Sequence, residues 1–491
     1  MSRVVVIGAG VGGLATAARL AAAGHSVTIC EQAPTLGGKL STQMAQGFRW
    51  DTGPSLLTMP QALAELFAAT GAPLDDHLSL RRLDPIAAYR FADGTRVEAA
   101  ADLDQFCSNL DAALGPGSGD DWHRLMQRAA AMWQTVEQPF LRSPLQGART
   151  LAALARSGRS VGTVAPHRTL RGVGRQYLRD PRLRMLLDRY ATYTGSDPRR
   201  APATLAVIPY VEQTLGAWYV EGGLYRIVQA LAQRAEELGV EVRTGADVTA
   251  IDVQQGRVAG VSLAGGEILP AQVVVANADA EHVYADLLPR QLAARPLRRL
   301  RRAPRSLSGF VLLLGLRGTT PDLAHHTVLF PRNYDAEFDA IFGRRRGAVA
   351  DPTLYVAAPH DPAVAPVGDE SWFVLANAPL TDAADWRDRR RAERYADHLL
   401  ALLATRGYDV RDRITTRDVL TPADLERRTR AAGGAIYGTS SNGPRSAFLR
   451  PANRSNVAGL FLVGGSSHPG GGLPLVMLSS EIVAQAIGPA A

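Results

Sequence analysis

The sequence predicts an α/β fold in which a domain built on a parallel sheet is interleaved with a second domain of mixed α+β structure. Three observations lead to this prediction. The chain opens with a short apolar strand, a glycine loop and an alanine-rich helix, VVVIGAGVGGLATAARLAAAG. It closes with another apolar strand, glycine loop and helix, GLFLVGGSSHPGGGLPLVMLSSEIVAQAI. Its 491 residues are enough for two or three lobes around a large core.

The composition is that of an ordinary globular chain, with 46% hydrophobic and 21% charged residues. No apolar run approaches the roughly 20 residues that cross a bilayer. Only two cysteines occur, Cys30 and Cys107, which excludes a disulfide framework and a cysteine metal cluster and favours a cytoplasmic location. The net charge of +7 with only 6% aromatic residues does not favour nucleic acid as a partner, so an anionic membrane surface is the better candidate.

The opening RVVVIGAG is typical of a strand buried on both faces of a parallel sheet. Gly8 permits a tight turn, Gly10 lets the backbone approach a pyrophosphate, and Gly13 lets helix and strand pack closely. The N-terminus of the following helix attracts phosphates. Glu31, 18 residues after Gly13 at the end of the strand SVTICE, would accept hydrogen bonds from ribose hydroxyls. These features together predict a Rossmann-like dinucleotide site.

A second glycine turn favours FAD over NAD as the dinucleotide. The turn contains Gly38 and Lys39, the only lysine in the chain, and it precedes the segment GFRWDTGPS with Pro54. A flavin needs many contacts along its ribityl chain and ring, whereas a single NAD-binding fold has no need of this extension.

The middle of the chain predicts a change of domain more than once. Residues 102–187 have a helical pattern, residues 221–288 return to strands and a helix of the nucleotide domain, and residues 289–451 mix strands with charged helices. The predicted Rossmann-like FAD-binding domain comprises residues 1–95, 221–288 and 452–491, and the predicted substrate-binding and membrane-associating domain comprises residues 96–220 and 289–451.

The whole length resembles the bacterial-type phytoene desaturase family of carotenoid biosynthesis. These FAD-dependent flavoproteins share the amine-oxidase and GDP-dissociation-inhibitor fold. Besides the glycine motifs and DTGPS, the resemblance covers WYVEGGLYRIVQAL, VVVANADAEHVYADLL, LAHHTVLFP and the closing VGGSSHPGGGLPLV, of which the last two are the more specific. The family usually has arginine where this chain has Lys39, so the charge is kept but the planar fork is lost.

The resemblance implies that the closing loop lies beside the flavin that the opening loop binds. The helix starting near Leu473 and Pro474 would direct its N-terminus, with about half a positive charge, at the flavin. Val248 would contact the adenine end through its backbone, and Asn277 would lie in the loop that closes the nucleotide domain. The predicted FAD-binding residues are Gly8, Gly10, Gly13, Glu31, Gly38, Lys39, Pro54, Val248, Asn277, Gly464, Gly465, Leu473 and Pro474.

The resemblance implies an oxidoreductase that desaturates an acyclic carotenoid, phytoene or a close relative, by hydride transfer to the flavin. A hydrocarbon offers few hydrogen-bonding groups, so its site should be a long apolar tunnel. The flavin would then pass its electrons to a quinone or oxygen. No metal site is expected, and no catalytic residue is assigned. His468 is nearest the flavin segment, but a role in ordering the glycine loop accounts for it equally well, and His325 and His326 are interpreted as a strand end.

Other functions remain open at this point. A 3,4-desaturase of a hydroxylated acyclic carotenoid or a diapocarotenoid desaturase would have the same motifs. A polyene isomerase would use FAD without net redox change, and a lipid carrier like the GDP-dissociation inhibitors would share only the fold. The intact glycine motif and Glu31 argue against a carrier that has lost its cofactor.

The segment ARPLRRLRRAPR, Ala294–Arg305, predicts an arginine-rich helix bounded by Pro296 and Pro304. Leu297 and Leu300 fall largely opposite the arginines. The helix is interpreted either as an ordinary solvated surface helix or as an interfacial helix on anionic lipid, which would make the protein peripheral on the inner face of the cell membrane. The arginines predicted on one side are Arg295, Arg298, Arg299, Arg302 and Arg305.

Overall fold

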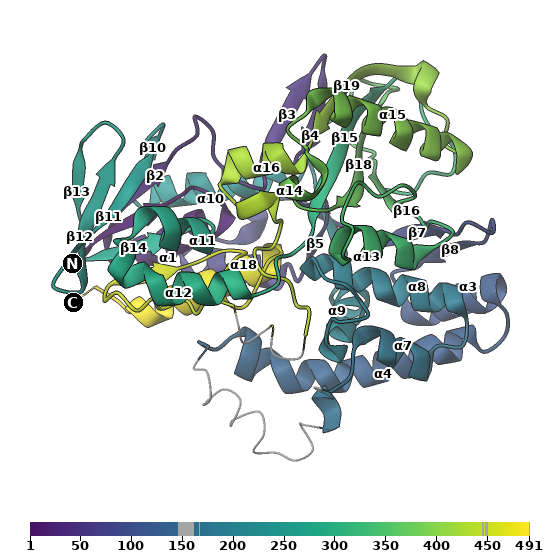
Figure 1. Cartoon of the computed structure of the whole chain (residues 1–491), viewed down its shortest axis with the longest axis horizontal. Helices are drawn as coiled ribbons and strands as arrows, with labels where there is room; N and C mark the ends of the chain where they lie inside the picture. The colour runs from purple at the N-terminus through teal and green to yellow at the C-terminus, as the bar shows by residue number, and fades with distance from the viewer. Residues whose placement is uncertain (146–161, 166, 444–445, 447–449, 491) are drawn as a thin grey trace.

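A five-stranded parallel sheet lies at the centre of one half of the molecule, the left half in Figure 1. The computed structural model describes residues 1–145, 162–165, 167–443, 446 and 450–490. The strands lie in the order β10, β2, β1, β14, β20, and every neighbouring pair is parallel. Strands from distant parts of the chain therefore meet in one sheet, which confirms the predicted α/β fold. They are β1 (Arg3–Ile7), β2 (Ser26–Glu31), β10 (Glu241–Thr244), β14 (Val273–Ala276) and β20 (Leu460–Leu462).

Strand β1 is buried on both faces, as its continuous β-branched run predicts. Val4 and Val6 pack in the core under three helices, whereas Val5 and Ile7 pack in a separate core under a small antiparallel sheet. The helices are α1 (Val11–Ala22), α10 (Tyr225–Glu237) and α18 (Leu473–Ile487), and α2 (Gln61–Ala69) joins them. The small sheet consists of β11 (Val248–Gln254), β12 (Arg257–Leu263) and β13 (Ile268–Pro270).

A seven-stranded mixed sheet dominates the other half, in the order β19, β15, β18, β17, β16, β7, β8. Every residue of its strand β15 is buried, because α15 (Arg389–Thr405) covers one face and the hairpin β3–β4 covers the other. The hairpin is β3 (Thr42–Ala45) and β4 (Phe48–Asp51). The sheet consists of β7 (Ala87–Arg90), β8 (Arg96–Ala99), β15 (Ser308–Leu316), β16 (His326–Leu329), β17 (Leu354–Ala357), β18 (Glu370–Ala378) and β19 (Ile414–Leu420).

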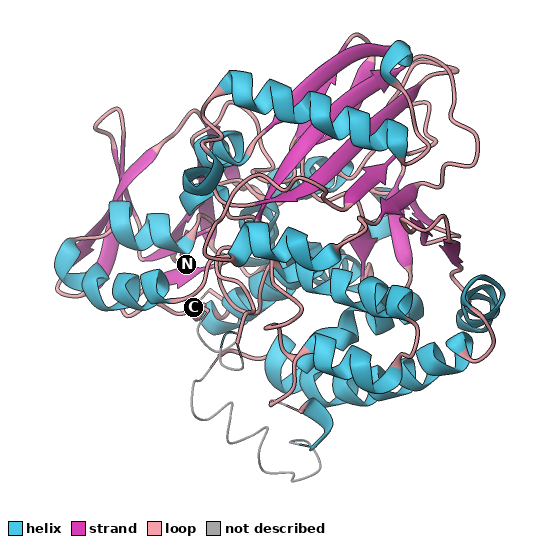
Figure 2. Cartoon of the chain, turned by 45° about the vertical axis from the view of Figure 1, so that its right-hand side comes forward, coloured by secondary structure: helices cyan, strands magenta, loops and turns pink. Residues whose placement is uncertain are grey.

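A helical layer lies below the seven-stranded sheet (Figure 2). The prediction of helices over residues 102–187 is confirmed where the structure describes them; residues 146–161 and 166 lie outside the described part. Trp122, Leu125 and Leu187 form part of the core between these helices and the sheet. The layer contains α3 (Leu103–Leu114), α4 (Ser118–Val136), η2 (Glu137–Leu141), α7 (Leu170–Tyr177), α8 (Pro181–Arg189), η3 (Tyr190–Thr194), η4 (Ala203–Ala206) and α9 (Val207–Leu215).

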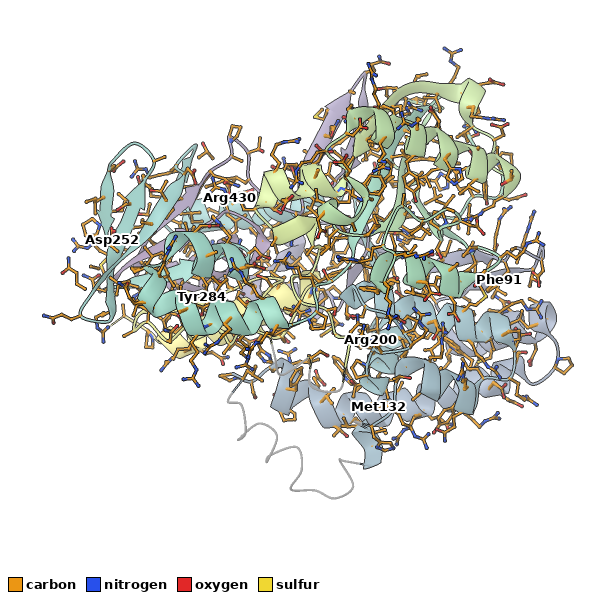
Figure 3. All side chains as sticks on the ribbon, in the orientation of Figure 1. Phe91, Met132, Arg200, Asp252, Tyr284 and Arg430 are labelled. Carbon is orange, nitrogen blue, oxygen red and sulfur yellow. The ribbon has the colours of Figure 1, made fainter. Side chains whose placement is uncertain are left out.

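Helix α16 (Pro422–Thr429) links the two halves. Arg430, which is labelled in Figure 3, caps the C-terminus of α16. It donates from Nη1 and Nη2 to the two carboxylate oxygens of Asp247, at 2.9 and 2.8 Å. Arg428 donates from Nη2 to Oγ1 of Thr52 at 2.9 Å. The remaining short elements are β5 (Leu57–Thr58), β6 (Leu80–Arg82), β9 (Ala217–Val220), η1 (Leu74–Asp76), α11 (Ala280–His282), η5 (Val283–Leu287), α13 (Tyr334–Phe342), α14 (Thr381–Ala384), η6 (Arg411–Arg413) and η7 (Ala432–Gly434).

The arginine-rich segment forms helix α12 (Arg290–Arg302) on the surface, on the side away from the seven-stranded sheet (Figure 1). The helix begins six residues before Pro296, so the prediction that this proline starts it is wrong. A proline inside a helix has no N–H for the carbonyl four residues earlier, but here that carbonyl, of Leu292, accepts from the Asn456 amide at 3.0 Å. The helix does end before Pro304. Within the described residues, no helix is long and apolar enough to cross a membrane.

One of the five arginines predicted on one side of this helix lies outside it. Arg305 follows the end of α12 and forms an ion pair with Glu281, Nη2 to Oε2 at 2.7 Å. Arg295, Arg298 and Arg302 are exposed on the helix, and Leu300 is buried beneath it.

Candidate functional site

The opening loop between β1 and α1 leaves no room for side chains. Gly8 has φ of +92°, which favours glycine. A Cβ on Gly13 would lie 2.1 Å from the carbonyl oxygen of Gly8, so the first turn of α1 presses directly on the end of β1. The close packing of helix and strand predicted from Gly13 is confirmed.

The glycine loops from the two ends of the chain meet at Asn277, directly after β14. A Cβ on Gly10 would lie 2.7 Å from the Asn277 amide, and one on Gly464 would lie 2.8 Å from it. A Cβ on Gly12 would lie 3.4 Å from the Cα of Gly464. In the orientation of the Asn277 amide that gives both its oxygen and its nitrogen a partner, the oxygen accepts from the N–H groups of Gly10 (3.1 Å) and Gly13 (3.3 Å). These N–H groups at the start of α1 thus face a position suited to an oxygen acceptor.

Glu31 is held at the carboxyl end of β2, next to the opening loop. Its Oε2 accepts from the N–H of Ala9 at 2.7 Å, and its Oε1 accepts from the N–H of Ala33 at 2.9 Å. The N–H of Ala246 donates to the Glu31 carbonyl at 2.9 Å, and Val248 begins β11 two residues later. The predicted ribose acceptor and the predicted adenine contact therefore lie in adjacent segments.

The second glycine turn packs against the first. The N–H of Gly37 donates to the carbonyl of Ala9 at 2.9 Å, and a Cβ on Gly38 would lie 3.5 Å from the Cα of Gly10. A Cβ on Gly53 would lie 2.0 Å from the carbonyl oxygen of Lys39, which places the loop with Pro54 directly against this turn.

Three ionisable side chains gather behind these loops. Lys39 donates from Nζ to the carbonyl oxygens of Ile436 (2.7 Å) and Ala435 (3.3 Å). Burial lowers the pKa of Lys39 and raises the pKa of Asp279, although both residues keep some accessible surface. Arg450 is the third member, and the sequence did not single it out.

Arg450 is a buried cation without a carboxylate partner among the described residues. It is 4% exposed and donates from Nη1 to the carbonyl oxygens of Tyr437 (3.0 Å) and Gly465 (2.9 Å) and from Nη2 to that of Thr439 (2.8 Å). Burial lowers the pKa of Arg450 to about 10. With Lys39 and Asp279, it leaves the cluster with one excess positive charge, which suits an anionic ligand.

Helix α18 begins at Leu473 with Gly472 as its N-cap, as predicted, and Pro474 lies in its first turn. No acidic residue lies in that turn, and no side chain caps it. A Cβ on Gly465 would lie 3.4 Å from the Cα of Gly471, so the closing loop folds tightly before the helix. The N-terminal N–H groups of α18 are thus open to a partner with negative charge.

The arrangement fits FAD. Two helix N-termini that each follow a glycine N-cap suit phosphate and flavin oxygens, the Glu31 carboxylate suits ribose hydroxyls, and the buried excess cation suits a dinucleotide anion. All 13 predicted residues lie on segments adjoining these loops. The described residues contain no group of three or more His, Cys, Asp or Glu side chains that could hold a metal ion.

The three histidines of interest are buried. His468 donates from Nε2 to the carbonyl oxygen of Ser143 at 3.0 Å, and its own carbonyl accepts from Asn453 (2.8 Å) and Ser479 (2.9 Å). These contacts support the role of His468 in ordering the loop. His326 starts β16, with His325 just before it, which confirms the interpretation of this pair as a strand end.

Cys30 is a buried residue of β2. Burial raises the pKa of its thiol to about 11, so the thiolate that redox chemistry needs is disfavoured.

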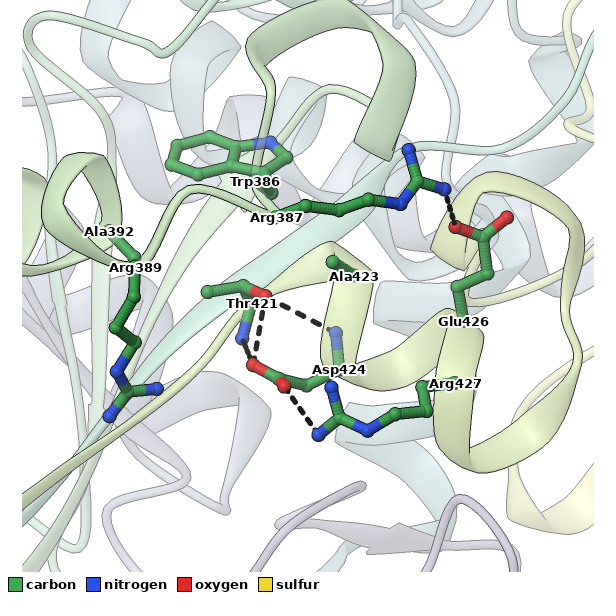
Figure 4. A pocket seen from close by; sticks show the side chains of 9 residues that line it. All are labelled: Trp386, Arg387, Arg389, Ala392, Thr421, Ala423, Asp424, Glu426 and Arg427. Carbon is green, nitrogen blue, oxygen red and sulfur yellow. Dashed lines mark hydrogen bonds and ion pairs between the residues drawn. The ribbon is translucent and has the colours of Figure 1, made fainter.

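A surface hollow of about 630 Å³ lies away from the glycine loops, between α15 and α16 (Figure 4). Two of its three arginines are paired within it: Arg387 pairs with Glu426 at 2.8 Å, and Arg427 pairs with Asp424 at 2.7 Å. None of its lining residues belongs to the glycine loops, so it is not the cofactor site.

Comparison with known proteins adds the chemical context. The family model described as flavin containing amine oxidoreductase matches residues 11–488. The chain is 35% identical to 4,4'-diapolycopene oxygenase of Methylomonas sp, with 98% of this chain and 97% of that protein covered. It is 34% identical to hydroxyneurosporene desaturase of Rubrivivax gelatinosus (99% and 93% covered) and 34% identical to the zeta-carotene-forming phytoene desaturase of Myxococcus xanthus (98% and 93% covered).

Solved structures share the fold at lower identity. A putrescine oxidase double mutant aligns with a TM-score of 0.68 and 16% identity, covering 99% of this chain and 98% of that chain. This similarity shows that the chain shares the fold of that oxidase.

Proposed function

Because the chain belongs to the flavin-containing amine oxidoreductases, and within them to the bacterial-type carotenoid desaturases, we propose that it desaturates an acyclic carotenoid with FAD as its cofactor. The observation that supports this most is that the opening and closing glycine loops meet at Asn277, in a chain that matches carotenoid desaturases over its full length. We call these two loops together with Asn277 the cradle. A carrier protein would not need a dinucleotide cradle.

The residues of the cradle have distinct proposed roles. The start of α1 with Gly10 would hold the pyrophosphate, and Glu31 would accept hydrogen bonds from the ribose. Lys39 and Arg450 would balance the negative charge of the cofactor, and the N-terminus of α18 would face the flavin ring. We also propose the division of the chain into an FAD-binding part and a substrate part. β7 and β8 lie on either side of residue 95 and pair with each other, so the first boundary is best placed before β7.

Each desaturation removes two hydrogens from neighbouring carbons and forms one carbon–carbon double bond. Bound FAD supplies the acceptor for a hydride from one carbon, and a proton leaves the other carbon for solvent. The chain contributes alignment and exclusion of water. The positive N-terminus of α18 stabilises negative charge next to it, and buried Arg450, which has no ion-pair partner among the described residues, adds to the positive charge of this region.

The electron acceptor and the location of the protein complete the proposal. A quinone or oxygen would reoxidise the cofactor, and a cytoplasmic protein peripheral on the inner membrane face would reach a lipid-dissolved substrate directly. Helix α12 supports this location, because Arg295, Arg298 and Arg302 are exposed on one surface helix where anionic lipid would attract them.

The test is a reaction with defined components. The FAD-loaded protein is incubated with an acyclic carotenoid in liposomes without any nicotinamide nucleotide. We expect the product to lose two hydrogens per turnover and its absorption to move to longer wavelength as conjugation grows. An isomer of unchanged mass as the sole product would contradict desaturation.

Oxygenation is a second candidate, favoured by the 35% identity to a diapolycopene oxygenase. The same reaction mixture distinguishes the two, because oxygenation adds oxygen to the product mass. Labelled oxygen gas would show whether that atom comes from O2.

A further inference from the structure

A cluster of charged and phenolic side chains is buried in the substrate half, where a hydrocarbon site would need only apolar groups. We call it the Arg189 cage. Arg189 and Glu212 are 8% and 3% exposed, although charged residues are rarely buried without an ion pair. The cage consists of Tyr89, Arg189, Tyr190, Tyr193, Glu212 and Tyr355.

Glu212, the acidic residue of the cage, accepts hydrogen bonds from two tyrosine hydroxyls. Oε1 of Glu212 accepts from the hydroxyl of Tyr190 at 2.6 Å, and Oε2 accepts from that of Tyr193 at 3.4 Å. Glu212 lies on α9, whereas both tyrosines lie on η3, so these bonds fix the end of α8 against α9. Burial raises the pKa of Glu212, and the two phenols oppose the rise.

The basic side of the cage is not saturated. A guanidinium carries five N–H donors, and within the described residues that of Arg189 donates one hydrogen bond, from Nη1 to the Tyr193 hydroxyl at 3.0 Å. Its Cζ lies 5.1 Å from the ring centroid of Tyr193, 5.6 Å from that of Tyr355 and 6.0 Å from that of Tyr89. These rings hold the cation in place but leave most of its donors without an acceptor.

A second polar atom beside the cage also has no partner. The Tyr355 hydroxyl lies 2.8 Å from Nδ1 of His326, which is 2% exposed. The other ring nitrogen of His326, Nε2, is buried and has no hydrogen-bond partner among the described residues. Leaving a buried polar atom unpaired costs free energy, so Nε2 of His326 points to a polar group that a ligand supplies, and the Arg189 N–H groups without a protein acceptor among the described residues could donate to the same group.

The cage adjoins the cofactor loops on two sides. The Tyr355 hydroxyl lies 2.6 Å from Oγ of Ser55, the residue after Pro54. On the other side, a Cβ on Gly195, the residue after η3, would lie 2.9 Å from the Tyr437 ring, and a Cβ on Gly471 would lie 2.4 Å from the same ring. One aromatic ring therefore separates the cage segment from the closing glycine loop.

Resting on the carotenoid chemistry proposed above, we propose that the Arg189 cage binds an oxygen substituent near one end of the substrate, so that the preferred substrate is an oxygenated acyclic carotenoid. The free N–H groups of Arg189 donate to a hydroxyl or carbonyl oxygen. Glu212 and the tyrosines keep the guanidinium oriented and its charge balanced. Since the cage adjoins the cofactor loops, the bond that is oxidised lies near the oxygenated end of the molecule.

The first test uses the wild-type, FAD-loaded protein and three substrates with one carbon skeleton: the hydrocarbon, its terminal tertiary alcohol and its terminal aldehyde. We expect kcat/KM to be about 10- to 100-fold higher for at least one oxygenated substrate, the range for a hydrogen bond to a charged group. The alcohol and aldehyde arms identify which oxygen the cage accepts. Equal or better use of the hydrocarbon would overturn the inference while leaving the desaturase proposal intact. Failure with all three would contradict the desaturase proposal itself.

The second test assigns the preference to the cage. Arg189→Met should remove the preference, mainly by raising KM for the oxygenated substrate. Tyr193→Phe, which removes one hydroxyl only, should reduce the preference with less risk to folding. Arg184→Met, on the same helix, is the matched control, because Arg184 donates to the Leu178 carbonyl at 2.8 Å and has no contact in the cage.

Binding is measured separately from turnover, by the absorbance shift of each carotenoid on transfer from liposomes to protein. Retention of the preference in Arg189→Met and Tyr193→Phe proteins that unfold at the wild-type temperature would overturn the assignment. An equal loss for hydrocarbon and oxygenated substrates would do the same, because it would indicate a purely structural cage.

Discussion

At the scale of single residues, Gly10 is the position at which a side chain should harm the cofactor site most directly. A Cβ there would lie 2.7 Å from the Asn277 amide, and larger groups would enter the space before α1. We expect Gly10→Val to lower FAD affinity at least about tenfold, because the backbone no longer approaches the pyrophosphate. Flavin absorbance retained after gel filtration measures this. Gly265→Val is the control, since no atom lies within 4 Å of a Cβ at that position; similar FAD loss in both variants would contradict the assignment.

The residue-level predictions succeeded where the signal is local. Gly8 and Gly13 are recognisable because a turn and a helix start within a few residues of each other require them. Arg450 had no such signal, because its burial results from carbonyl groups that the fold brings from other segments. The same holds for Arg189, since Glu212 and Tyr355 reach it from α9 and β17. Tyr190 and Tyr193 carry no local signal either, because their hydroxyls bind a carboxylate that lies 22 and 19 residues away in the sequence.

His468 should make stability depend on pH. Burial lowers its pKa from 6.5 to about 4, so the folded protein keeps the ring neutral while the unfolded chain takes up a proton below pH 6.5. The stabilising contribution is therefore complete above pH 6.5 and is lost as the pH falls towards 4. Between pH 7 and pH 5 we expect a loss of about 2 kcal/mol from this residue.

Chemical denaturation at both pH values measures this loss. His468→Gln keeps an amide that can donate to the Ser143 carbonyl but does not titrate, so its stability should fall by about 2 kcal/mol less than that of wild type. An identical fall in the two proteins would show that His468 is not the titrating group.

At the scale of secondary-structure elements, α12 is the candidate for membrane contact. Replacing Arg295, Arg298 and Arg302 with Gln should weaken binding to anionic liposomes at low salt by about 1 kcal/mol for each arginine. Flotation of the protein with liposomes measures the effect. Arg305 is left unchanged, because its pair with Glu281 gives it a structural contact.

The matched control removes three arginines elsewhere on the surface. Arg344, Arg345 and Arg346 are exposed in one loop, so their replacement with Gln changes the net charge by the same amount. Equal weakening in both triple variants would indicate an effect of net charge alone. Unchanged flotation of the α12 variant would remove this helix from the membrane proposal.

The bounds of a helix were predictable where glycine or proline residues in the sequence mark its ends. The start of α18 follows from the glycines before Leu473 and from Pro474, a residue suited to a first helical turn. For α12, Pro296 suggested a start, yet the helix begins at Arg290, because Leu300 and Ala293 pack on the core and extend the helical face in both directions. Tertiary packing overrode the local signal.

At the scale of the whole molecule, the cofactor should act as a link between distant segments. The cradle joins the start of the chain, the loop after β14 and the closing loop, and a ligand that binds only the assembled site stabilises the fold. We expect FAD at about 100 times its dissociation constant to add about 2.7 kcal/mol to the free energy of unfolding. Thermal unfolding with increasing FAD measures this, and Gly10→Val should show no such increase at the same concentrations.

The interleaving of the two halves was predictable in outline, because strand and helix patterns alternate along the chain. The pairing of β7 with β16 was not, because these strands are separated by more than 200 residues and nothing in either marks its neighbour. The packing of the hairpin β3–β4 on β15 was not predictable for the same reason. The hairpin follows the first glycine loops in the sequence, but β15 lies more than 200 residues further along the chain.

Because the two glycine loops meet at Asn277, the cofactor site can be completed only late in the synthesis of the chain. The ribosome completes Gly13 long before Gly464, and at about 5 to 20 residues per second this interval is roughly 20 to 90 s. During that time the nascent chain lacks β20 and α18, so the edge of β14 is unpaired and half of the cradle is missing. The complete site therefore forms only after β20 and α18 have been synthesised, and until then the unpaired edge of β14 is open to pairing with other chains.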